Sequence, residues 1–219
     1  MGNGGRLAYV CAVVTALVVT SGCGVVREGD VTERLTQYVD PFIGTGGHGH
    51  VFLGANVPFG FVQLGPSQEV KGWDWCSGYH YSDSTMLGFS HTHLSGTGIG
   101  DLGDILFVPA RDPSIGQMRF SHEDERARPG YYAVRLEEAG VDVELTATTH
   151  VGVHRYRFDE SDTAYVKVNL AYGIGWDRPM ETHVEQVGDS AVSGYRYSRG
   201  WARDQKIYFH AEFSRPMAR

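Results

Sequence analysis

The sequence has few cysteines, which limits covalent cross-linking of the fold. Its 219 residues contain three, Cys11, Cys23 and Cys76. Cys11 lies in an apolar leader and Cys23 directly follows that leader, so Cys76 is left without a partner and no intrachain disulfide is expected. A lone cysteine of this kind is most often a buried small apolar side chain, and we predict that role for Cys76.

Basic charge is also scarce. The chain has 19 Lys and Arg against 26 Asp and Glu, a formal net charge of -7. Removal of residues 1–22 would take away one further positive charge, that of Arg6, and -7 would become -8. Binding of nucleic acid requires a basic face that attracts phosphates, so nucleic acid is not expected as a partner.

No apolar run is long enough for a membrane-spanning helix. The run from Leu7 to Val19 follows Arg6 and is shorter than the roughly 20 residues that cross a bilayer, which is typical of a signal peptide. The segment Ser21–Cys23 resembles the cleavage site of bacterial lipoproteins, although Thr20 departs from the usual aliphatic residue. We predict a signal peptide at 1–22, a lipidated Cys23 and an extracytoplasmic, membrane-anchored protein, with plain secretion as the alternative.

The remainder of the chain lacks a sustained helical period. Residues 23–36 show no apolar period and are predicted to form a flexible tether, and residues 37–219 are predicted to form one domain. With 29 glycines and 12% aromatic residues, this region favours β structure with tight turns. The 197 residues that remain after cleavage, 219 minus 22, suffice for a sizeable core.

Alternation of apolar and polar residues predicts the strands. It is clearest over 141–153, where six apolar residues occupy odd positions, and its phase then shifts, which indicates a bulge or turn at 152–155. Gly188–Ser190 is typical of a turn. Many short strands of this kind predict an all-β sandwich. The other predicted strands are Tyr131–Leu136, Ala164–Leu170, Ala191–Tyr197 and Lys206–Phe213.

Two glycine sets match a dinucleotide-binding spacing, but their context argues against that function. One set lies in 44–49 and the other in 98–103. A dinucleotide site requires a helix after the glycines, whereas Pro58 follows the first set and the strand-like run Ile105–Val108 follows the second. These glycines are therefore predicted to allow tight turns or a close approach of the backbone to a ligand.

Two histidine pairs raise the question of a metal. His48 and His50, like His91 and His93, are two residues apart, a spacing that places both rings on one face of a strand. No carboxylate follows either pair at close spacing to complete a transition-metal site. Hydrogen bonds to a ligand or to loop backbone are therefore the favoured role, and no metal ligand is assigned.

The segment 73–83 is rich in aromatic and polar side chains. Aromatic rings beside carboxylates and hydroxyls suit a sugar, because the C–H face of a pyranose packs on a ring while its hydroxyls need hydrogen-bond partners. The alternative is an aromatic corner of the core, which composition alone slightly favours. The segment contains Trp73, Asp74, Trp75, Tyr79, His80, Tyr81 and Asp83.

Several long motifs, in one order, together resemble the opening of glycoside hydrolase family 92. The resemblance runs from about residue 38 to the C-terminus, and weaker matches include Gly194-Tyr195 and Gly200-Trp201. The strongest matches are Val39–His50, Gly54–Gly60, Gln63–Pro66, Ser77–Asp83, Gly88–Gly98 and Gly100–Asp104.

The resemblance implies a calcium-dependent, inverting exo-α-mannosidase. In that family a β-sandwich similar to the galactose mutarotase fold packs against an (α/α)6 barrel, and the substrate pocket lies between them. For this chain it implies that side chains of the sandwich hold the terminal mannose of mannose-containing glycans by hydrogen bonds and stacking. The implied substrate-binding residues are Trp73, Asp74, Trp75, His80, His91 and His93.

The chain departs from the family in lacking the helical barrel, which supplies both catalytic carboxylates and most calcium ligands. No catalytic residue is therefore assigned, and we expect a sugar-binding N-terminal half that is inactive alone, with its sandwich truncated near the C-terminus. One alternative is a lectin-like lipoprotein that binds mannosides without cleaving them. Another is an autonomous hydrolase that uses Asp74 and Asp104.

Overall fold

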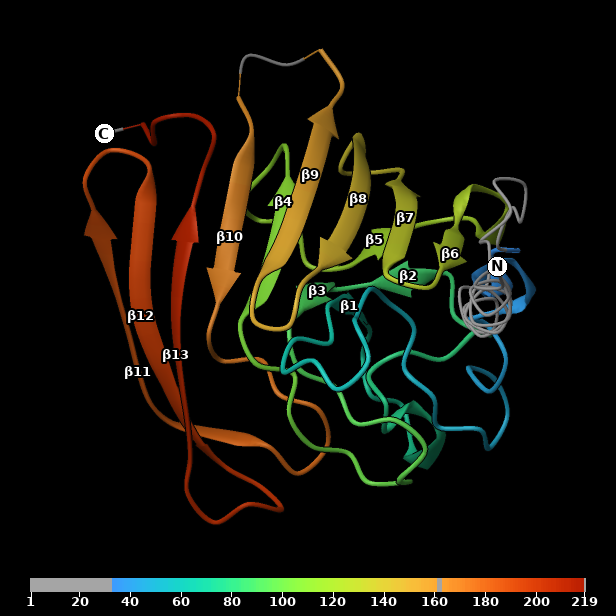
Figure 1. Cartoon of the computed structure of the whole chain (residues 1–219). Coiled ribbons are helices and arrows are strands. Elements are labelled where there is room, and N and C mark those ends of the chain that lie inside the picture. The colour runs from blue at the N-terminus through green and yellow to red at the C-terminus, as the bar shows by residue number, and fades with distance from the viewer. Residues whose placement is uncertain (1–32, 161–162, 219) are drawn as a thin grey trace, which may run out of the picture. The chain divides into compact units, whose positions relative to one another are not determined.

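The computed structural model describes residues 33–160 and 163–218 (Figure 1). The predicted signal peptide, Cys23 and most of the predicted tether lie outside these residues. The described part contains no α-helix, and its helical turns are the 3-10 segments η1 (Leu35–Tyr38), η2 (Trp73–Trp75) and η3 (His122–Asp124). Nothing helical in this part of the chain has the length and apolar character needed to cross a membrane.

The strands form antiparallel sheets. The first sheet has the order β1-β3-β4-β10, the second β6-β7-β8-β9 and the third β11-β12-β13, and β2 pairs with β5. The bounds for the first sheet are β1 (Gly65–Ser67), β3 (Gly88–Ser90), β4 (Leu106–Ala110) and β10 (Tyr165–Asn169). Those for the second are β6 (Arg126–Arg128), β7 (Tyr131–Leu136), β8 (Val141–Ala147) and β9 (Gly152–Phe158). The rest are β2 (Thr85–Met86), β5 (Met118–Arg119), β11 (Arg178–Val187), β12 (Ala191–Arg199) and β13 (Gln205–Glu212).

The main core lies between the first and second sheets. Leu106 and Val108 of β4 share one buried cluster with the alternating Val141, Val143 and Leu145 of β8. Because alternate residues of a strand point to opposite faces, this pattern buries one face of each sheet against the other. The predicted all-β sandwich is confirmed.

A second cluster covers the opposite face of β4. There Phe107 packs with Val166 and Val168 of β10 and with Ile207 and Phe209 of β13. Figure 1 shows β13 next to β10. β4 is consequently buried on both faces, which explains its continuous apolar run.

The predicted single strand over 141–153 is wrong, because this segment is a hairpin. β8 ends at Ala147, which pairs with Gly152 at the start of β9, and the amide of Thr148 donates a hydrogen bond to the carbonyl of Val151 (2.8 Å). The phase shift that the sequence shows is therefore real, but the turn comes earlier than 152–155. The remaining predicted strands match to within two residues, whereas β11 was missed because it is exposed along nearly its whole length.

A buried arginine fixes the third sheet. Arg196 of β12 is fully buried, and its guanidinium donates to Asp104 Oδ1 (2.7 Å), to Asp177 Oδ1 and to the carbonyl oxygens of Leu170 (3.0 Å) and Tyr172 (2.7 Å). Asp104 precedes β4 and Asp177 precedes β11, so one side chain ties β12 to both segments. The guanidinium remains charged, which offsets two carboxylates that would otherwise be unpaired in the interior.

We expect Arg196→Met to lower the free energy of unfolding by about 3–5 kcal/mol, because it leaves Asp104 and Asp177 buried without their cation. Chemical denaturation at pH 7 measures the change. Arg199→Met, on the exposed end of the same strand, is the matched control and should change stability little. An equal midpoint for Arg196→Met and the parent protein would contradict this expectation.

Candidate functional site

η2 places two tryptophans in different environments. Trp73 is 63% exposed, and its indole Nε1 donates a hydrogen bond to the carbonyl oxygen of Gly98 (2.7 Å). Trp75 is partly buried, stacks on His80 with ring centroids 4.5 Å apart, and donates from Nε1 to Asp83 Oδ2 (2.8 Å). Trp73 therefore presents its ring to solvent. Trp75 instead packs against His80 and holds the loop 73–83 in place.

Three exposed tryptophans are anchored to one short segment, residues 98–101. Besides the bond from Trp73, the amide of Trp176 donates to the carbonyl of Gly100 (2.8 Å), and the amide of Trp201 donates to Asp101 Oδ2 (3.1 Å). Each of the three side chains is 58–63% exposed. We call Trp73, Trp176 and Trp201 the tryptophan trio. Only Trp73 was predicted from the sequence as a site residue.

Two glycines allow the loops that carry Trp176 and Trp201 to approach this segment. Gly175 has a φ of +58°, and a Cβ there would lie 2.6 Å from the carbonyl oxygen of Gly100. A Cβ at Gly200 would lie 2.0 Å from Asp101 Oδ1. Both distances are too short for any side chain, so the backbone must be bare at these positions. A glycine directly before each tryptophan is the sequence signal that could have identified them.

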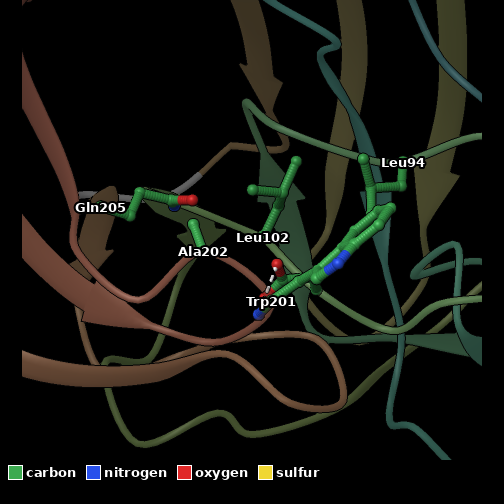
Figure 2. A pocket seen from close by; sticks show the side chains of 6 residues that line it. Leu94, Leu102, Trp201, Ala202 and Gln205 are labelled. Carbon is green, nitrogen blue, oxygen red and sulfur yellow. Dashed lines mark hydrogen bonds between the residues drawn. The ribbon is translucent and has the colours of Figure 1, made fainter.

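A cavity of about 350 Å³ opens beside Trp201 (Figure 2). It is lined by Leu94, Asp101, Leu102, Trp201, Ala202 and Gln205. Asp101 is only 3% exposed, and among the described residues its Oδ1 has no hydrogen-bond partner. Burial raises the pKa of the Asp101 carboxyl, and the neighbouring Asp177 and Asp104 add to the shift. The cavity therefore combines an aromatic ring and apolar walls with amide and carboxyl groups.

A second polar cluster lies next to Trp73. Asp74 Oδ1 is 2.6 Å from His48 Nδ1 and 3.1 Å from His50 Nε2, and the His50 ring lies 4.2 Å from the Trp73 ring. The hydrogen bond with His48, together with that of His50, lowers the pKa of Asp74. The structure thus brings Asp74 of η2 to a histidine pair that is far from it in sequence.

His91 and His93 lie apart from this cluster, inside the sandwich. Their Nδ1 atoms donate to the carbonyl oxygens of Ile105 and Gln63, each at 2.8 Å. Burial lowers the pKa of both residues to about 4. Burial also lowers the pKa of His154, whose Nε2 is 3.0 Å from His91 Nε2. Of the predicted substrate-binding residues, Trp73 and Asp74 come together at the surface, Trp75 and His80 support them, and His91 and His93 are held in the interior.

The glycines and the cysteine of this region follow their predictions. In the described residues no helix begins directly after either glycine set, and β4 begins three residues after the second set. Cys76 is buried and free, as predicted. Burial raises the pKa of its thiol, which makes it a poor nucleophile.

Comparison with known proteins agrees with this fold. The model of the glycosyl hydrolase family 92 N-terminal domain matches residues 38–219. An α-mannosidase of family 92 from Bacteroides thetaiotaomicron, solved in complex with mannoimidazole, superimposes with a TM-score of 0.79 at 39% identity, over 84% of this chain and 26% of that one. Another family 92 glycosyl hydrolase gives a TM-score of 0.69 at 30% identity, over 80% and 26%.

A curated relative gives the same result. An uncharacterized secreted glycosidase of Arthroderma benhamiae is 32% identical in an alignment of 163 residues that covers 69% of this chain and 20% of that protein. The chain therefore belongs to glycosyl hydrolase family 92 and corresponds to its N-terminal domain. It spans about a fifth to a quarter of the length of these relatives.

We expect the free energy of unfolding to fall as the pH is lowered from 6.5 to 4. Unfolded histidines take up protons near pH 6.5, whereas folded His91 and His93 resist protonation down to about pH 4, so acid favours the unfolded chain in this window. Urea denaturation at several pH values measures the effect. His93→Gln should give a shallower pH dependence. Stability that stays level from pH 6.5 to 4 would exclude this explanation.

Proposed function

We propose that this domain binds α-mannosides as one wall of the substrate pocket of an exported exo-α-mannosidase. The observation that carries the proposal is the anchoring of the tryptophan trio on residues 98–101, beside the cavity of Asp101 and Gln205. Exposed rings bind the C–H face of a pyranose, and carboxyl and amide groups next to them bind its hydroxyls. Membership of family 92, and the mannoimidazole complex of one relative, support mannose as the sugar.

The predicted binding residues take different roles in this proposal. Trp73 and Asp74 face solvent and contact the sugar directly. Trp75 and His80 act by fixing the loop, through their mutual stacking and the bond to Asp83. Direct contact of His91 and His93 with the sugar stays a prediction, and their hydrogen bonds to strand backbone favour an indirect role.

The proposal assigns hydrolysis to residues outside this chain. Inversion requires two carboxyl groups roughly 6.5–9.5 Å apart that can exchange protons with water and substrate. Asp104, one candidate from the sequence, is fully buried, and its oxygens already accept bonds from Arg196, Thr92 and Gln205. This argues against an autonomous hydrolase, and we propose that a helical barrel supplies both catalytic groups.

We also place the calcium ion that the family resemblance implies outside this chain. Calcium prefers six to eight oxygen ligands. In the described residues, the cluster whose ligand atoms converge within 4.8 Å consists of His48, His50 and Asp74. Two of its three donors are imidazole nitrogens, so this cluster does not fit calcium, and no step of the proposed function depends on that ion here.

Sugar binding is tested by isothermal titration of the protein with methyl α-mannoside. We expect Trp73→Ala and Trp201→Ala each to weaken binding roughly fivefold, since an aromatic contact contributes about 1 kcal/mol. Phe59→Ala removes a fully exposed ring elsewhere and should leave affinity unchanged. Binding without hydrolysis by this chain alone would favour the lectin-like alternative. Equal affinity of all three variants and the parent would contradict the proposed site.

We also propose that the protein is exported from the cytoplasm and anchored to the membrane by a lipid. The apolar run with its Ser-Gly-Cys end predicts lipidation of Cys23, and one relative is described as secreted. We expect the parent protein to be recovered with the membrane fraction of a bacterial host and Cys23→Ala to be lost from it, because the acyl chains supply the anchor. Blotting of the fractions measures this, and Cys76→Ala is the control. Membrane retention of Cys23→Ala would exclude the lipid anchor.

A further inference from the structure

We propose that His48, His50 and Asp74 form a binding site for a divalent transition metal, with zinc as the best-suited ion. One nitrogen from each histidine and one oxygen from Asp74 lie within 4.8 Å of one another. The atoms are His48 Nδ1, His50 Nε2 and Asp74 Oδ1. This site is distinct from the cavity beside Trp201.

The two nitrogen–oxygen distances suit a common ion after a small adjustment. Metal bonds of about 2.0–2.2 Å place two neighbouring ligand atoms roughly 3–3.5 Å apart. His50 Nε2 is already 3.1 Å from Asp74 Oδ1, and His48 Nδ1 is 2.6 Å from it. The His48 side chain is 77% exposed, so it can move outward by a few tenths of an ångström without disturbing the core.

The donor types select the class of metal. Imidazole nitrogens suit zinc, copper, iron and nickel, whereas calcium and magnesium prefer oxygen alone. Three protein ligands leave at least one coordination position for water or for a ligand hydroxyl. His48 is exposed and His50 is buried, so the cluster reaches solvent at His48, whose ring centroid lies 5.8 Å from that of Trp73.

The surrounding loops hold two of the ligands in place before any ion binds. His50 packs against Trp73, which is fixed by the carbonyl of Gly98, and the carbonyl of His50 itself accepts a hydrogen bond from the amide of Gly96 (2.7 Å). Asp74 belongs to η2, between two anchored tryptophans. Ligands whose positions are already fixed lose less conformational entropy on binding, which favours affinity.

The sequence did not predict this site because its carboxylate lies 24 residues from His50 and 26 from His48. Local spacing finds only the histidine pair. The competing explanation is a proton-mediated cluster, in which the histidines simply donate hydrogen bonds to Asp74. The two differ in their response to metal, because a transition ion must displace the protons that join these atoms.

The test uses untagged protein at pH 7.5 and zinc alone as the probe. We expect about one equivalent of zinc to remain bound after dialysis and at least tenfold weaker binding in His48→Ala and in Asp74→Asn. The exposed His183→Ala is the matched control and should retain parental binding. Cobalt should give the visible absorption of a low-symmetry site in the parent protein, and this absorption should be lost in the same two variants.

Two results would contradict the proposed zinc site. Absence of stoichiometric zinc at micromolar free metal, or equal binding by the parent, His48→Ala and Asp74→Asn, would overturn the inference and favour the proton-mediated cluster. Because the probe is the metal without sugar, the result is independent of the mannoside titration. Loss of sugar binding in Trp201→Ala with normal zinc content would separate the two sites directly.

Discussion

The guanidinium of Arg196 makes the contacts on which the exposed loops depend. It joins β12 to Asp104, three residues after the segment 98–101 that anchors the tryptophan trio, and to Asp177, the residue after Trp176. A buried ion pair adds little net stability when compared with apolar packing, but it fixes geometry because each charge tolerates few positions. The arrangement of surface rings that we assign to sugar binding is therefore set by a charge interaction in the interior.

Five histidines fall into two groups that differ in their hydrogen-bond partners. His93 is buried and His91 and His154 are half-buried, and all three remain neutral and act as hydrogen-bonding parts of the sandwich. His48 is exposed and His50 is buried, and both bind the same carboxylate oxygen of Asp74. Partners, and not spacing, separate the groups, since His48/His50 and His91/His93 are both two residues apart.

The strands could be predicted where one face is buried and the other is wet. The alternation over Tyr131–Leu136 gave β7 with correct bounds, and that of β8 gave its start. The end of β8 was missed because Val151 and Val153 are apolar yet exposed, so they extended the pattern across the turn. β11 was missed because it lies exposed on both faces and carries no period for the sequence to show.

The candidate site was only partly predictable, because some of its residues come together from distant segments and leave no local pattern in the sequence. Trp73 and Asp74 were predicted through the family resemblance, since the composition of their aromatic segment alone slightly favoured a core role. Trp176 and Trp201 stand alone in sequence and join Trp73 only through hydrogen bonds to residues 98–101. Contacts between segments so far apart follow from the packing of the third sheet, which no local pattern encodes.

The lack of space for a side chain at Gly175 and Gly200 limits which substitutions this domain can accept. Glycine-rich loops are usually taken as the tolerant parts of a protein, where insertions and substitutions accumulate. Here two of them are as constrained as the core, because main chain lies against main chain or a buried carboxylate. Any change of ligand preference must therefore come from exposed side chains beside these glycines, such as that of Ala202, while the path of the loop backbone stays fixed.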